Sequence, residues 1–249
     1  MNATLLILGG TAEAFELAER MVEKPNLRVL SSLAGRTNAP RLPPGQIRIG
    51  GFGGASGLSE FLRTERIDAV VDATHPFASR MGWNADRACT AMSTPLLRLE
   101  RPAWQRQKAD RWDEVGSWDE AAERLRRHAS RAFLALGRLD LDAFAELDGI
   151  WCLIRSVERP DLPPGLAQST LVSSRGPFTL EGDLALLREH RIDTIACKNS
   201  GGPIGYAKIE AARQLGLRVV MRQRPPRPDL PMVMSVAEAV AWVDRVLSD

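Results

Sequence analysis

The sequence predicts two open α/β domains, each built on a parallel sheet, with a ligand cleft between them. Short apolar runs alternate with amphipathic helical patterns in residues 1–98, and a second alternating series of similar size lies in residues 117–249. Residues 99–116 are polar and basic and contain Pro102, so we interpret them as a linker. Strands alternating with helices are typical of parallel βαβ units, whose ligands bind beyond the carboxyl ends of the strands.

The first series begins with a buried strand that turns directly into a helix. Residues 4–8 are apolar and precede a glycine pair, and residues 13–22 place apolar side chains at helical spacing. Further short apolar or β-branched runs predict strands at 27–33, 47–50, 69–73 and 96–99, with helices at 58–66 and 77–91.

The second series begins at a Ser-x-x-Glu capping box, Ser117 and Glu120, which predicts a helix to about residue 128. Strands are expected at 132–136, 150–156, 170–174, 194–197 and 217–221, and helices at 140–147, 181–190 and 204–215. A second box, Ser235 and Glu238, introduces a closing helix at 236–247, which we assign to the second domain.

Composition excludes several classes of protein. The formal net charge of +2 argues against a nucleic-acid binder, and no apolar stretch is long enough for a membrane helix, which predicts a cytoplasmic protein. Cys89, Cys152 and Cys197 lie far apart without C-x-x-C spacing, which favours reduced core thiols over disulfides or a metal site.

The junction Gly9-Gly10-Thr11 is the first candidate ligand site. Glycines between a strand and a helix let backbone N–H groups and the positive helix end approach a phosphate. The fingerprint G-x-G-x-x-G is absent, so a tight turn without a ligand remains the alternative.

The second strand ends in hydroxyl groups, Ser31 and Ser32, and is followed by Arg36. An NAD-binding unit places an acidic residue about here to accept from the ribose 2′-hydroxyl. Arginine and hydroxyl groups suit a 2′-phosphate instead, which favours NADPH over NADH. The alternative is an exposed loop arginine.

Two further strand ends carry unusual residues. After the third strand, the stretch Gly50-Gly51-Phe52-Gly53-Gly54 favours close approach of backbone to a ligand, although a flexible loop is the competing interpretation. After the fourth, Asp72, Thr74 and His75 precede a proline. His75 could orient substrate, donate a proton or cap the next helix.

In the second domain, Ser174 and Arg175 follow one strand and the loop Lys198-Asn199-Ser200-Gly201-Gly202 follows another, with Lys208 beyond it. We interpret the loop as an anion-binding turn, the alternative being a capped turn with solvated lysines. Together with Arg98 and Arg101, these cations predict a substrate rich in carboxylates or phosphates.

Five motifs in register resemble the precorrin-6A reductase family of cobalamin biosynthesis, over essentially the whole chain. They are Gly9-Gly10-Thr11-Ala12-Glu13, the 72–78 stretch from Asp72 to Ala78, Arg101-Pro102-Ala103-Trp104, the 174–178 stretch from Ser174 to Phe178, and Lys198-Asn199-Ser200-Gly201-Gly202 with Lys208.

The resemblance implies two Rossmann-like domains and an NADPH-dependent reductase that delivers hydride to C19 of precorrin-6A, giving precorrin-6B. It implies that NADPH is lined by Gly9, Gly10, Thr11, Ala12, Glu13, Ser32, Arg36, Gly53, Thr74 and His75. It implies that the tetrapyrrole faces Ser174, Arg175, Lys198, Asn199, Ser200, Gly201, Gly202 and Lys208. Because hydride transfer needs mainly positioning, Lys198 and His75 are our candidates for that role, and no dedicated acid is identified.

Two alternatives stay open, and the sequence argues against a third. The substrate could be the cobalt-containing precorrin-6A of the anaerobic pathway, or the chain could be an NADPH-binding regulatory module without catalysis. A short-chain-type reductase would need Tyr-x-x-x-Lys, and Tyr206 is followed by Glu210 instead. The expected partners are a small tetrapyrrole polycarboxylate and, transiently, neighbouring enzymes of the pathway, but no nucleic acid or membrane.

Overall fold

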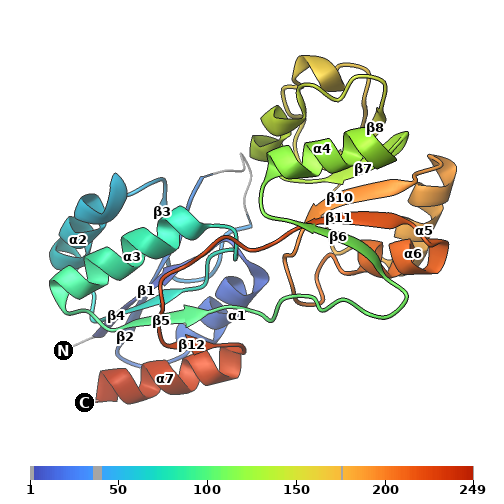
Figure 1. Cartoon of the computed structure of the whole chain (residues 1–249). Coiled ribbons are helices and arrows are strands. Elements are labelled where there is room, and N and C mark those ends of the chain that lie inside the picture. Colours follow the sequence, from blue (N-terminus) through green and yellow to red (C-terminus); the bar gives the residue numbers. More distant parts are fainter. Residues whose placement is uncertain (1–2, 36–40, 175, 249) are drawn as a thin grey trace. The chain divides into compact units, whose positions relative to one another are not determined.

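The computed structural model describes residues 3–35, 41–174 and 176–248. The chain divides into two compact units, the first made of Met1–Pro102 with Pro225–Asp249 and the second of Ala103–Arg224 (Figure 1). Each unit contains a six-stranded parallel sheet, as the alternation of strands and helices predicted.

The sheet of the first unit has a doubly wound order. Its strands are β1 (Ala3–Leu8), β2 (Leu27–Leu33), β3 (Gln46–Ile49), β4 (Ala69–Asp72), β5 (Leu96–Leu99) and β12 (Met232–Val233). They lie in the order β12-β5-β4-β1-β2-β3. The central strands β1 and β4 are largely apolar and buried because helices cover both faces of the sheet.

Four helices cover this sheet, two on each face (Figure 1): α1 (Ala12–Met21), α2 (Gly54–Thr64), α3 (Ser79–Met92) and α7 (Val236–Ser248). One core lies under α1 and α7 and includes Leu17 and Val243. The other lies under α2 and α3 and includes Leu58 and Ala85.

The second unit repeats this architecture. Its strands are β6 (Arg111–Val115), β7 (Arg131–Ala135), β8 (Trp151–Ser156), β9 (Thr170–Ser173), β10 (Thr194–Lys198) and β11 (Arg218–Arg222), in the order β6-β11-β10-β7-β8-β9. Its helices are α4 (Trp118–His128), α5 (Leu180–Glu189) and α6 (Ala207–Leu215), with 3₁₀ turns η1 (Arg138–Phe144) and η2 (Pro164–Leu166). The α4 and η1 side holds one core and the α5 and α6 side the other.

The expected domain boundaries are wrong at two places. The closing segment, assigned to a second domain at 117–249, returns to the first unit, where β12 pairs with β5 and α7 packs on the first core. The expected linker at 99–116 contains β6, the edge strand paired with β11. Alternation of strands and helices along the chain does not reveal which sheet an element joins. The sequence of β6 is largely charged, so it did not indicate an edge strand.

One expected helix has another type, and two others begin later than expected. The predicted helix at 140–147 is the 3₁₀ turn η1, and the helix expected from residue 77 begins at Ser79. The helix expected from residue 204 begins at Ala207, because Gly205 has a φ of 78° that a helix cannot contain.

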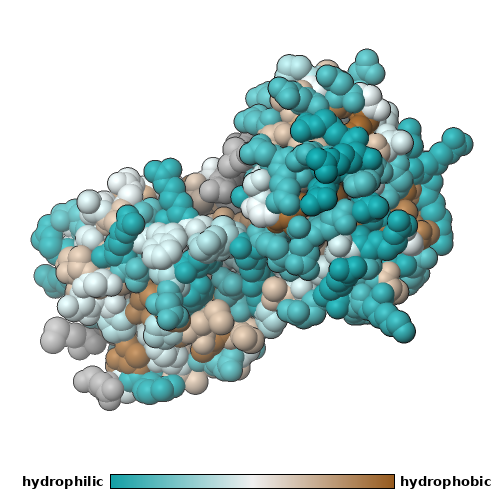
Figure 2. All heavy atoms as spheres, viewed as in Figure 1, coloured by the Kyte–Doolittle hydropathy of each residue, from teal (hydrophilic) through white to brown (hydrophobic). Residues whose placement is uncertain are grey.

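Hydrophilic side chains cover most of the face drawn in Figure 2, with small hydrophobic areas between them. Among the residues that the structure describes, no helix is both long and apolar enough to span a membrane. All three cysteines are buried and free, which confirms the interpretation as core thiols.

Candidate functional site

The carboxyl ends of three neighbouring strands meet at the glycine turn of the first unit. In the sheet register, Leu8 lies opposite both Ser32 and Asp72. The residues predicted to bind cofactor after β1, β2 and β4 are therefore brought to one edge of the sheet.

The turn itself is tied to both neighbouring strands. Gly9 N donates to Ser32 O at 2.9 Å, and Thr11 Oγ1 donates to Ala73 O at 2.8 Å. Thr11 also caps α1 by accepting from Ala14 N at 3.1 Å. Gly10 has a φ of 110°, and a Cβ built there would meet no heavy atom within 4 Å. Open space therefore lies beside the N-terminus of α1, where an anion is stabilised.

The first turn of α1, which begins at Ala12, contains a carboxylate that is already paired. Glu13 Oε2 lies 2.8 Å from Arg101 Nη1, and the two side chains are only 19% and 13% exposed. This ion pair offsets the negative charge that Glu13 would otherwise place near a bound phosphate.

The glycine-rich loop after β3 is held from within. The guanidinium of Arg48 donates to Gly50 O at 2.6 Å and Gly51 O at 2.7 Å, and lies 3.9 Å from the Phe52 ring centre. Burial lowers the pKa of Arg48. Gly53 caps α2 with a φ of 80°, and its missing side chain leaves open space. These bonds argue against a freely flexible loop. Arg36, the cofactor contact expected after β2, lies outside the described residues.

The end of β4 contains a buried polar turn. Asp72 is fully buried, and its Oδ1 accepts from Thr74 N at 3.1 Å and from Thr74 Oγ1 at 2.6 Å. His75 Nδ1 accepts from Phe77 N at 3.2 Å, in the turn that precedes α3. This bond shapes the turn before α3 but does not cap the helix, because the N-cap residue of α3 is Ala78 and no side chain caps it.

A residue that the sequence did not indicate completes this turn. Arg227, in the returning segment, forms ion pairs with the second oxygen of Asp72 and with Glu100 Oε2, the latter at 3.1 Å. Arg98, which we expected among the substrate-facing cations, is also buried and donates to Pro228 O at 2.6 Å. Both arginines therefore hold the returning segment, residues 225–249, against the rest of the first unit.

In the second unit, the loop after β10 is built around Trp104. Asn199 is buried; its Oδ1 accepts from Trp104 N at 2.8 Å and its Nδ2 donates to Trp104 O at 3.1 Å. Trp104 Nε1 donates to Gly202 O at 2.6 Å. The side chain of Asn199 is thus occupied in holding the loop.

The carbonyls of the same loop receive further bonds. Arg224 Nε donates to Asn199 O at 3.1 Å and its Nη2 to Ser200 O at 3.2 Å. Gly201 and Gly202 have φ values of 71° and 65°, a left-handed conformation that glycine adopts without strain. The loop thereby turns back sharply beyond the end of β10.

Lys198, the last residue of β10, is paired with Asp140. Its Nζ lies 2.6 Å from Asp140 Oδ2, and the side chains are 21% and 19% exposed. Asp140 Oδ1 accepts from Trp118 Nε1 at 2.8 Å and lies 3.8 Å from Arg222 Nη1. Lys198 lies opposite Arg222 in the register of β10 and β11, so the two cations are at the ends of neighbouring strands.

Lys208 is buried beneath the loop instead of solvated. Its Nζ donates to Gly205 O at 2.6 Å and lies 4.8 Å from the Trp104 ring centre. Burial lowers the pKa of this ammonium group.

Ser174 lies apart from this loop. It follows β9, the edge strand separated from β10 by β7 and β8, and its N donates to Ser156 O at 3.1 Å. Arg175 lies outside the described residues.

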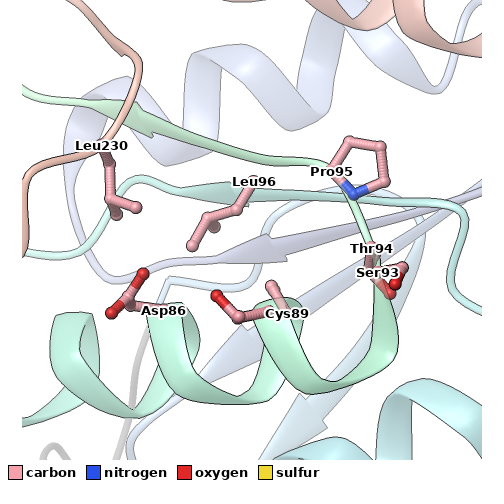
Figure 3. Close-up of a pocket in the computed structure, with 8 residues that line it drawn as sticks. Asp86, Cys89, Ser93, Thr94, Pro95, Leu96 and Leu230 are labelled. Atoms are coloured by element: carbon pink, nitrogen blue, oxygen red, sulfur yellow. The ribbon is translucent and has the colours of Figure 1, made fainter.

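One cavity of about 310 Å³ lies in the first unit, beside the beginning of β5 (Figure 3). Leu96 of β5, Cys89 of α3 and Leu230 of the returning segment line it. Burial, together with the carboxylates of Asp72 and Asp86, raises the pKa of the Cys89 thiol to about 12. This cavity is at the amino end of the strand, away from the edge that carries the glycine turn.

Sequence reasoning missed Asp140 and Arg227, and the sequence held a signal for each. Asp140 lies just beyond a predicted strand end, which is where we looked for functional residues elsewhere. Arg227 lies in the proline- and arginine-rich run at 222–228, a marked change of composition before the closing helix.

The chain matches the family model described as precorrin-6x reductase CbiJ/CobK over residues 4–244. It is 48% identical over 242 residues to a precorrin-6A reductase of Rhodococcus erythropolis, with 96% of each chain covered. It is 46% identical over 241 residues to a precorrin-6A reductase of Mycobacterium tuberculosis, again with 96% of each covered. A solved structure of a CobK precorrin-6A reductase matches with a TM-score of 0.90 and 38% identity, over 98% of this chain and 97% of that one. The chain therefore belongs to the precorrin-6x reductase CbiJ/CobK family.

Proposed function

We propose that this protein reduces precorrin-6A to precorrin-6B in cobalamin biosynthesis, by hydride transfer from NADPH to C19 of the macrocycle. The observation that carries the proposal is the similarity, over almost the full length, to relatives named precorrin-6A reductase. The geometry of the two strand-end sites supports it.

The first unit is the proposed NADPH side. The open space at Gly10 and the N-terminus of α1 fit a pyrophosphate, whose charge the backbone N–H groups would meet. The sheet register brings Ser32 and Thr74 to the same edge. The sequence near Arg36 favours the 2′-phosphate of NADPH, since no acidic residue follows β2 there.

The loop after β10 is the proposed substrate side. Lys198 and Arg222 stand at neighbouring strand ends and share one carboxylate, Asp140. These two cations would attract the carboxylates of a tetrapyrrole. Lys208 supports this loop from beneath through Gly205 O, so we assign it to loop shape rather than to direct contact.

NADPH, when bound, supplies the hydride. The residues of this chain contribute binding and orientation: the glycine turn binds the phosphates, the β4 end positions the ring-bearing half, and Lys198 grips a substrate carboxylate. Such positioning lowers the barrier because the reacting atoms are held close together before transfer.

The decisive experiment follows NADPH absorbance after precorrin-6A is added to the purified protein. Loss of absorbance at a rate proportional to enzyme, with precorrin-6B as product, supports the proposal. Parallel reactions contain NADH, or cobalt-precorrin-6A, to decide cofactor and substrate. Arg36→Ala is expected to weaken the binding of NADPH by about 1.5–3 kcal/mol and the binding of NADH much less. NADPH binding without consumption of either substrate would instead support the regulatory module.

A further inference from the structure

Arg227 is a buried cation of the first unit that contacts several polar side chains. Its side chain is 5% exposed, and its Nη2 pairs with Asp72 Oδ2 while its Nη1 lies 3.1 Å from Glu100 Oε2. Nη2 also lies 3.4 Å from Thr74 Oγ1. One guanidinium thus joins three polar side chains.

The fold leaves room for this guanidinium. Gly82 lies within α3, where glycine weakens a helix. A Cβ built on Gly82 would lie 2.7 Å from Arg227 Nη2 and 2.9 Å from its Nε. The helix therefore has its glycine at the position where a side chain would displace the guanidinium.

Through Asp72, Arg227 acts on the end of β4. Asp72 is fully buried, so its carboxylate needs an oppositely charged partner and hydrogen bonds in place of water. Arg227 binds one carboxylate oxygen, and the other accepts from Thr74 N and Oγ1 at 3.1 and 2.6 Å. The position of Thr74 accordingly depends on a guanidinium that lies 153 residues away in the sequence.

Arg227 and Glu100 also flank the two places where the chain crosses between units. The chain leaves the first unit after Pro102, two residues beyond Glu100, and re-enters at Pro225, two residues before Arg227. Their ion pair joins the outgoing and the returning segment within the first unit.

We propose that Arg227 is a positioning residue of the reductase, which fixes Asp72 and thereby Thr74 for cofactor binding. This inference rests on the proposed function, since it takes the β4 end as part of the NADPH site.

The test is a double-mutant cycle on NADPH affinity, using Arg227→Met, Thr74→Val and the double variant. Each single change is expected to raise the NADPH Kd about tenfold or more, and the double variant no further than the weaker-binding single one. Arg227→Lys, which keeps the charge but not the fork that reaches two carboxylates, should recover part of the affinity. The KM for precorrin-6A should stay within about twofold of wild type.

The matched control is Arg155→Met in the second unit. Arg155 pairs with Asp183 at 2.5 Å with side chains 7% and 3% exposed, so its removal should lower Tm in the same way without changing the NADPH Kd. Should Arg227→Met fail to fold, Arg227→Lys takes its place in the cycle.

Three results would overturn the inference. Arg227→Met with a lowered Tm but an unchanged NADPH Kd would make Arg227 purely structural. Additive losses in the cycle would show that it does not act through Thr74. A wild-type protein that binds no NADPH would refute the proposed function itself, and with it this inference, and the wild-type titration identifies that case directly.

Discussion

Replacing Lys198 with alanine tests the proposed substrate side most directly. The change removes the ammonium group that lies 2.6 Å from Asp140 Oδ2 at the end of β10. Asp140 then keeps Trp118 Nε1 at 2.8 Å, and Arg222 Nη1 at 3.8 Å is the nearest remaining cation of its cluster. The variant therefore loses a cation and exposes part of an anion in the same place.

The expected magnitude follows from the geometry of the pair. A charge-assisted hydrogen bond from a partly buried ammonium group to a substrate carboxylate contributes about 1.5–3 kcal/mol. At about 1.4 kcal/mol per factor of ten, the KM for precorrin-6A should rise roughly 10- to 100-fold. The kcat should fall as well if the macrocycle shifts, because C19 then lies farther from the nicotinamide.

The assay is steady-state kinetics with each ligand varied in turn, combined with a direct NADPH titration. Asp140→Asn in the Lys198→Ala background removes the exposed anion, so the double variant should have a lower KM than Lys198→Ala alone. Lys108→Ala, at an exposed lysine of the same unit, is the control and should leave both constants unchanged.

Unchanged kinetics in Lys198→Ala would make Lys198 a surface lysine without a role in binding. Loss of NADPH affinity with an intact KM for precorrin-6A would place this loop on the cofactor side. Either result would refute the division of labour between the two units.

Three further predictions concern the glycine turn, the thiols and the loop. Gly10→Val should abolish NADPH binding, measured by titration, because the φ of 110° is strained for valine and its side chain fills the open space; retained affinity in a folded variant would make the turn merely structural. Burial raises the pKa of the Cys152 thiol from 9.0 to about 12. The stability that the neutral buried thiol contributes is fully present below pH 9 and is lost as the pH rises from 9 to about 12. Between pH 8 and 10 the free energy of unfolding should fall by about 1.4 kcal/mol less in Cys152→Ala than in wild type, measured with guanidinium chloride, and equal slopes would contradict this. Asn199→Asp should lower stability by roughly 3 kcal/mol, because a buried carboxylate would face the Trp104 carbonyl; a Tm equal to wild type would refute a stabilising role of the Asn199–Trp104 hydrogen bonds.

Much of the fold could be predicted because patterns among neighbouring residues indicate its strands, helices and turns. Apolar runs bounded by glycine predicted the central strands, and the Ser117 and Ser235 boxes predicted two helix starts, both of which the structure confirms within a residue or two. The edge strands β6 and β12 were missed because they are half-exposed or only two residues long and lack an apolar run. The candidate site could be predicted only as far as strand ends and glycine turns indicate one.

By itself, the sequence determined the alternation of strands and helices, the two parallel sheets and the positions of the glycine turns, because periodicity and turn chemistry act over a few neighbouring residues. The tertiary structure alone decided that α7 covers the first sheet, that Lys198 meets Asp140 across 58 residues, and that Arg227 meets Asp72 across 155. Such pairs depend on how the chain returns to a sheet it has left, and on the match of a buried cation to a buried anion. No local pattern encodes either, because both arise from packing between segments that are distant in the sequence.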